Sequence, residues 1–170
     1  MKPEKLTYTE RLILANQFKI LSIIDEDNSD GHKYCEDIVT HGYEGFYDEL
    51  YTGIYNPTPQ EICTETFDIL DMYRGIENSV AGLNESDKKK LDLERIEFKG
   101  FDANNDSHYG FMSFLVERAD RYDEYKGKYI NSHTASTLDK YRRMLKVFNT
   151  FGSDRNNMTG DHLKKLIDAV

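Results

Sequence analysis

The chain has 170 residues, a length typical of one domain with a single hydrophobic core. Its 12 Tyr and 9 Phe argue against intrinsic disorder, and it contains no apolar run of about 18 residues that could cross a membrane. The formal net charge of −9 repels phosphate backbones, which argues against a nucleic-acid partner.

Two helices are predicted near the N-terminus. Thr7 can cap the first helix, and Glu10 three residues later completes a capping box. Residues 11–24 are apolar on more than one face, so we expect this helix to be mostly buried. Residues 32–41 form the second predicted helix, which Gly42 ends.

A long central helix is predicted after a short one at residues 45–51. Thr58 can cap the long helix and Pro59 suits its first position. The helix extends to about Val80 and carries apolar-face residues spaced three or four apart: Ile62, Thr66, Ile69, Tyr73, Ile76 and Val80. This spacing indicates a helix at the centre of the core.

The second half of the chain is predicted to be helical as well. Residues 81–95 are a charged surface connection, and residues 93–98 alternate enough to form a short strand or an extended arm. Helices are expected over residues 106–121, 138–148 and 159–169. Residues 140–170 carry 7 Lys/Arg against 3 Asp/Glu, so this end is basic. The predicted fold is therefore all-α, one compact orthogonal bundle of about seven helices over residues 1–170.

The stretch "IDEDNSDGH" resembles a calcium-binding loop but does not complete the pattern. A frame that starts at Asp25 places Asp30 where the loop needs glycine, and a frame that starts at Glu26 ends on Asp37 where it needs glutamate. Cys35 and Cys63 match no metal-binding spacing, and we read them as reduced, partly buried thiols. The sequence predicts no metal site and no cofactor.

No sequence motif assigns a reaction. The chain lacks HExxH, GxxxxGK, GxGxxG and GxSxG. An arginine followed six residues later by histidine is typical of HEPN ribonucleases, but Arg143 is followed there by Asn149, which cannot transfer a proton. Four histidines are expected at the surface: His32, His108, His133 and His162. Whether the protein is an enzyme stays open.

Five segments together resemble the YfbU family of bacterial proteins. They are "ERLILANQFKIL", "IVTHGYEGFYDEL", "CTETFDILDMYRGIE", "FKGFDANNDSHYGFMSFLVERADRY" and "LDKYRRMLKVF", and the resemblance extends from about Leu6 to Ala169. The resemblance implies a compact, mainly helical, cytoplasmic protein. It implies neither a reaction nor a cofactor.

The family pattern also places polar residues beside core positions. On this chain they are Arg11, Asn16, Gln17, Asp71, Tyr73, Asp102, Arg121, Tyr122, Tyr141 and Arg143. Arginine, aspartate and tyrosine can form a bonded network that fixes helices in place. Alternatively, they can line a small polar pocket that binds an anion or a peptide.

The sequence favours a regulatory or protein-interaction module that acts as a homo-oligomer, with an unidentified protein partner and no membrane partner. This interpretation follows from the missing catalytic motif, the aromatic content and the opposite charges of the two ends. The alternative is a hydrolase or HEPN-like ribonuclease that uses Arg143, Tyr141 and either Asp71 or Asp102.

Overall fold

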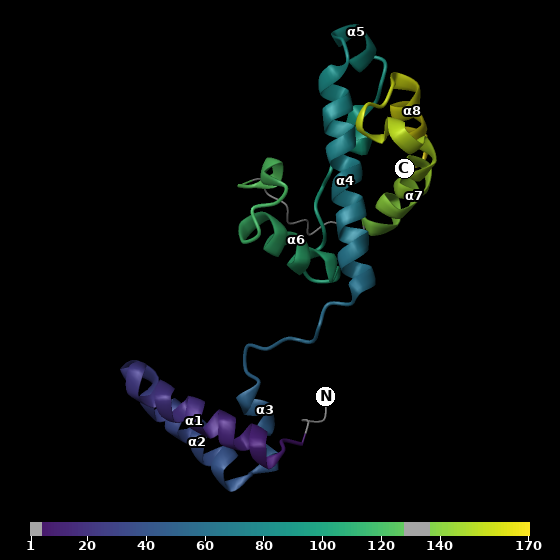
Figure 1. The fold of residues 1–170 in the computed structure, drawn as a ribbon. Coiled ribbons are helices and arrows are strands. Elements are labelled where there is room, and N and C mark those ends of the chain that lie inside the picture. The colour runs from purple at the N-terminus through teal and green to yellow at the C-terminus, as the bar shows by residue number, and fades with distance from the viewer. Residues whose placement is uncertain (1–4, 128–136) are drawn as a thin grey trace. The chain divides into compact units, whose positions relative to one another are not determined.

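The chain is all-α, as the sequence predicts. The computed structural model describes residues 5–127 and 137–170, and these residues form eight α-helices and five short 3-10 helices. They divide into two compact units, Met1–Asn56 and Pro57–Val170 (Figure 1). The single domain over residues 1–170 stays a prediction.

The first unit is a helical hairpin. Helix α1 (Tyr8–Ile24) starts with the predicted capping box: the Thr7 hydroxyl accepts from the Glu10 N–H at 3.2 Å, and the Glu10 carboxylate accepts from the Thr7 N–H at 2.7 Å. The turn η1 (Glu26–Asn28) leads to α2 (Ser29–His41), which packs along α1 and ends at Gly42 with a left-handed φ of 72°. The short helices η2 (Glu44–Phe46) and α3 (Tyr47–Leu50) complete the unit.

The prediction that α1 is mostly buried is wrong for the unit as described. No residue of α1 is buried, and the whole unit buries only Ile38, Val39 and Tyr47. The physical reason is that α2 covers one side of α1, whereas apolar residues lie on several sides of it. A large apolar surface is therefore left uncovered.

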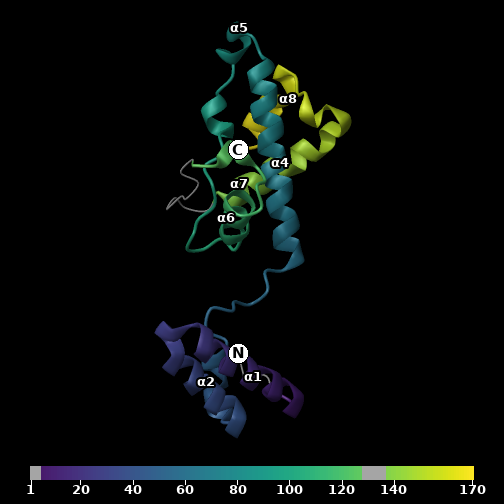
Figure 2. The same cartoon turned by 60° about the vertical axis from the view of Figure 1, so that its left-hand side comes forward.

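The second unit is organised around α4 (Gln60–Gly82). The helices α6 (His108–Glu117) and α7 (Leu138–Phe148) and the segment η5 (Asn149–Asn156) pack against it, as Figures 1 and 2 show. The predicted central helix is confirmed, but its N-cap is Pro59, without a side-chain capping bond. The last helix, α8 (Gly160–Asp168), contacts α7 and is capped by Thr159 as expected.

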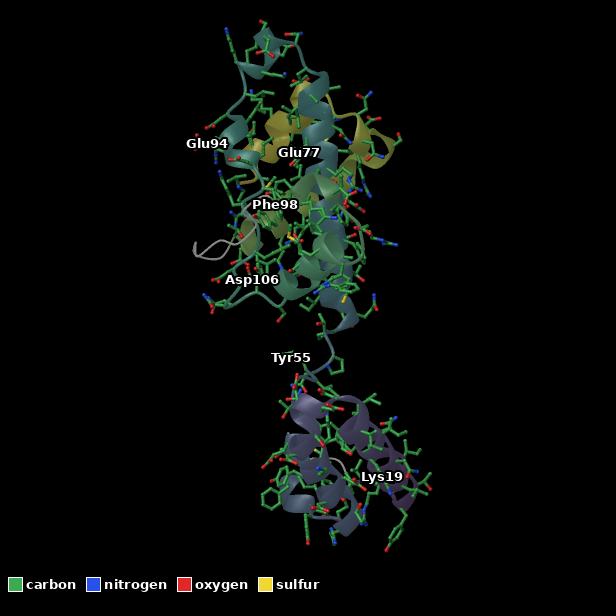
Figure 3. The ribbon with its side chains drawn as sticks, turned by 90° about the vertical axis from the view of Figure 1, so that its left-hand side faces the viewer. Lys19, Tyr55, Glu77, Glu94, Phe98 and Asp106 are labelled. Carbon is green, nitrogen blue, oxygen red and sulfur yellow. The ribbon has the colours of Figure 1, made fainter. Side chains whose placement is uncertain are left out.

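An aromatic cluster fills the core of the second unit. The ring of Phe98 lies 4.8 Å from that of Tyr73, 5.7 Å from that of Phe101 and 5.6 Å from that of Tyr141, measured between centroids. Figure 3 shows Phe98 among the side chains of this core. Aromatic pairs at such distances stabilise a core beyond the area that they bury.

Residues 93–98 do not form the short strand that their alternation suggested. Leu93–Ile96 is instead a 3-10 helix, η3, and no strand is assigned within residues 5–127 and 137–170. Leu93 and Ile96 are three residues apart, which is the period of a 3-10 helix and lets both face the core. The short helices α5 (Glu85–Lys88) and η4 (Asp123–Tyr125) lie in the connections.

Gly75 fixes the distance between α4 and η5. A Cβ at position 75 would lie 2.5 Å from the carbonyl oxygen of Arg155, which is backbone and cannot rotate away. We expect Gly75→Ala to lower the free energy of unfolding by about 1–3 kcal/mol, the usual cost of overpacking, in urea unfolding. Gly82→Ala in the same helix meets nothing within 4 Å and serves as the control. A native-like midpoint for Gly75→Ala would contradict this close approach.

Candidate functional site

The ten polar residues singled out by the sequence lie at separate places. Arg11, Asn16 and Gln17 belong to the first unit; Asp71, Arg121 and Tyr122 lie together; Tyr73 and Tyr141 are in the core; and Asp102 and Arg143 lie elsewhere in the second unit. Among the described residues of the second unit, Asp71, Arg121 and Tyr122 line one cavity together, and Tyr73 lines a separate, smaller one.

This cavity lies between α4 and residues 120–124 and has a volume of about 620 Å³. The Tyr122 hydroxyl donates to Asp71 Oδ1 at 2.7 Å. Sequence reasoning missed Arg74 and Glu124, which form a two-pronged ion pair with Nε–Oε1 at 2.5 Å and Nη2–Oε2 at 2.9 Å. Arg74 lies one helical turn after Asp71, a spacing that could have pointed to it.

The electrostatics of the cavity keep Tyr122 protonated. Burial and then the hydrogen bond to Asp71 raise the pKa of the Tyr122 hydroxyl, so it remains a donor at neutral pH. The guanidinium carbon of Arg74 lies 4.3 Å from the centre of the Tyr122 ring, a cation–π geometry. The ion pair with Glu124 raises the pKa of Arg74, which therefore stays charged.

The backbone beside this cavity is strained. Asp120 and Tyr122 have φ values of 48° and 59°, and they are the non-glycine residues with positive φ in the described part of the chain. A bulky residue in this region costs about 1–3 kcal/mol and needs compensating contacts. The hydroxyl bond to Asp71 and the cation–π contact supply such contacts.

A second cavity of about 490 Å³ shares Asp71 and Arg74 with the first and reaches η5. Burial and then the charge of Asp71 raise the pKa of Asp68 on this wall. From η5, Arg155 Nη2 donates to the Asn149 carbonyl at 3.1 Å, while its buried Nε has no acceptor among the described residues. We name the two joined cavities the polar groove.

The polar groove can bind a ligand through charges of both signs. Its walls carry the carboxylates of Asp68, Asp71, Asp120, Asp123 and Glu124 and the guanidinium groups of Arg74, Arg121 and Arg155. Searching the described residues finds no group of three or more His, Cys, Asp or Glu arranged to hold a metal ion. Tyr141 and Arg143, which the hydrolase hypothesis requires, do not line it; of the two alternative carboxylates, Asp71 lines it and Asp102 does not.

Comparison with known proteins identifies the family. The chain matches the YfbU domain over residues 4–169. It is also 31% identical over 171 residues to UPF0304 protein MJECS11 of Methanocaldococcus jannaschii, a match that covers 96% of this chain and 99% of that protein. The chain belongs to the YfbU family.

In this YfbU chain the two core tyrosines are structural. The Tyr141 hydroxyl donates to the Gly100 carbonyl at 2.9 Å and accepts from the Lys99 N–H at 3.1 Å. The Tyr73 hydroxyl donates to Met144 Sδ at 3.6 Å. Burial raises the pKa of both hydroxyls, so neither is suited to exchange protons at neutral pH.

Three other residues of the family pattern also fix backbone. Asp102 accepts from the Asn104 N–H at 2.9 Å and so closes the turn before α6. Arg143 Nε donates to the Ala169 carbonyl at 3.0 Å. In the first unit, Arg11 donates to the Val39 and Thr40 carbonyls, both at 2.6 Å, and so joins α1 to the C-terminal end of α2.

His108, which the sequence placed at the surface, is buried with 2% exposure, so this prediction is wrong. Its Nε2 lies 2.8 Å from Glu65 Oε2, and its ring stacks on that of Phe101. Arg142 donates to the same carboxylate from Nε at 2.7 Å and from Nη2 at 2.9 Å. The carboxylate of Glu65 therefore joins α4 to both α6 and α7, which compensates for burying an imidazole.

No helix within residues 5–127 and 137–170 is long and apolar enough to cross a membrane. Cys35 and Cys63 are free and partly buried, as predicted.

The hydrogen bond between the Tyr122 hydroxyl and Asp71 predicts a measurable loss of stability when it is removed. Tyr122→Phe should lower the free energy of unfolding by about 1 kcal/mol, the usual contribution of one hydrogen bond, in urea unfolding. Tyr109→Phe is the matched control, since no hydrogen bond of the Tyr109 hydroxyl is found among the described residues. Equal stability of the two variants would show that the Tyr122 bond contributes nothing.

The environment of the Glu65 carboxylate predicts that the stability of the fold depends on pH. The bonds from Arg142, then those from His108, lower the pKa of its carboxyl below the ordinary value of 4.5. A carboxyl with a lowered pKa stabilises the fold above its ordinary value, and this stability is lost as the pH falls through the folded-state pKa. The stability difference between the native chain and Arg142→Gln should therefore shrink below about pH 4.5. Arg143→Gln, which removes a bond to a carbonyl, should show no such trend.

Proposed function

We propose that this YfbU-family protein is a regulatory protein-interaction module that acts in the cytoplasm as a homo-oligomer, and that its N-terminal hairpin provides the contact surface. One observation carries the proposal. Twelve large hydrophobic side chains are strongly exposed among the described residues, and eleven of them lie in the first unit, Phe114 being the twelfth. The apolar surface is concentrated where the chain buries least.

A hairpin of this kind needs a covering surface. A unit of about 60 residues is marginally stable even when it buries about 60% of its unfolded surface, and this unit buries three hydrophobic side chains. Contiguous exposed apolar patches mark interaction sites in soluble proteins. On α1 alone, Leu12, Ile23 and Ile24 are 63%, 69% and 70% exposed.

The alternative of a hydrolase or HEPN-like ribonuclease has less support. It requires Tyr141 and Arg143 beside a carboxylate, but both bond to backbone carbonyls and neither lines the polar groove. The polar groove supports ligand or peptide binding more than hydrolysis. Its Arg74 already forms an ion pair with Glu124, and its Tyr122 already donates a hydrogen bond to Asp71.

Sedimentation velocity tests the proposal. At tens of micromolar we expect a species larger than the 19.8 kDa monomer. Because the exposed surface is apolar, raising the salt concentration from about 0.1 M to about 0.5 M should leave the association intact, whereas an ionic interface would weaken. A chain that sediments as a monomer at tens of micromolar protein would contradict the homo-oligomer.

A further inference from the structure

We propose that α1 pairs with α1 of a second copy, antiparallel and about a two-fold axis that passes between Asn16 and Gln17. This inference rests on the proposed function and names the contact that joins the copies. It is argued from the side chains around α1, their order along the helix and the exposure of each.

The side of α1 that faces away from α2 is free of charge. At 100° per residue, an arc of about 140° contains only Leu12, Ile23, Asn16, Thr9, Ile20, Ile13, Ile24 and Gln17. All eight are exposed, and the charged residues Glu10, Arg11 and Lys19 lie outside the arc. The first unit holds 5 Lys/Arg against 11 Asp/Glu, so an uncharged face lets a second acidic copy approach with less electrostatic repulsion.

The order of residues on this face matches a two-fold axis. In "ILANQFKI", Ile13 and Ile20 stand at equal distances on either side of the Asn16–Gln17 pair. Residues 13, 16, 17 and 20 form one diamond on a helix surface, the i, i+3, i+4 and i+7 positions that meet where two helices cross. A two-fold axis through its centre places Ile13 opposite Ile20 of the second copy, so that apolar meets apolar.

The same axis satisfies the two amides. It places Asn16 opposite Gln17 of the second copy, and each side-chain amide has both a donor and an acceptor to exchange. Interfaces between two identical copies are usually of this self-complementary kind. No side-chain hydrogen bond occupies either amide within the described part of the chain. A second α1 presents the complementary amide at each position.

The antiparallel direction follows from two features. Parallel neighbours would place the positive helix ends side by side, and so the macrodipoles would repel. In a parallel pair aligned in register, each isoleucine would lie opposite the same isoleucine of the second copy, and Gln17 would lie at the edge of the contact. Since Arg11 holds α2 against the opposite side of α1, the pairing joins two hairpins into a four-helix assembly with α2 on the outside.

The described residues of the second unit expose little large hydrophobic surface of their own. Within its described residues Phe114 is the strongly exposed large hydrophobic side chain, at 53% exposure. Covering the five aliphatic residues of the arc requires a surface with comparable apolar area. The arc of a second copy has that area.

Cysteine cross-linking tests the pairing in the full chain. In a background with Cys35→Ser and Cys63→Ser, one preparation carries Ile13→Cys and another carries Ile20→Cys, both at exposed positions. On mixing and mild oxidation, we expect a disulfide between the two chains. Either preparation alone should cross-link poorly, because the axis separates identical residues by roughly 10 Å along the helix, beyond disulfide reach.

The outcomes separate this inference from the proposed function. Rapid cross-linking of Ile13→Cys with itself would mean a parallel pair and would overturn the inference. Absence of any cross-link in a chain that still sediments as an oligomer would also overturn it, while leaving the homo-oligomer intact. A chain that sediments as a monomer would overturn both.

A charge substitution provides an independent readout. Ile20→Lys places a charge on each side of the axis, so we expect the dissociation constant to rise at least about a hundredfold, since two buried isoleucines are lost. Phe114→Lys is the matched control, because Phe114 is a similarly exposed hydrophobic residue of the second unit, at 53% against 57% exposure. Circular dichroism confirms that each variant keeps its helices. Equal dissociation constants for the two variants would contradict the pairing.

Discussion

The structure depends on one property of α1: the helix has more apolar surface than the other helices of its unit cover. This helix carries apolar residues on several sides, yet within the described residues of its own unit it packs mainly against α2. An exposed aliphatic surface of this kind is unfavourable in water, and the three buried residues of the hairpin cannot offset it. We therefore propose that the unit forms one part of an interface.

The second unit is built in the opposite way. Helices pack against its α4, its core is rich in aromatic rings, and several of its charged side chains form ion pairs. The ion pairs of Arg74 with Glu124 and of Arg142 with Glu65 hold distant segments onto α4. The Arg, Asp and Tyr residues that the family pattern singles out bond mostly to backbone or to neighbouring side chains, and the polar groove carries side chains of both charges.

Local signals predicted the helices well. The capping box at Thr7, the glycine after α2 and the spacing of apolar residues in α4 are short-range patterns, and each produced the expected helix. Apart from the 3-10 helix found in place of a strand at Leu93–Ile96, the failures concern contacts between residues far apart in the chain. The burial of α1 depends on what covers it, and the burial of His108 depends on Glu65, 43 residues earlier in the chain. Arg74 and Glu124 could not be paired from the sequence either, since 50 residues separate them.

Hydrogen exchange at several protein concentrations tests the central claim most directly. If a second copy covers α1, its backbone amides should exchange slowly at high concentration and lose protection on dilution, because dissociation uncovers a marginal hairpin. The exchange rates of the α4 amides should not change with protein concentration, so these amides serve as the internal reference. Exchange from α1 that does not change with concentration would contradict the account.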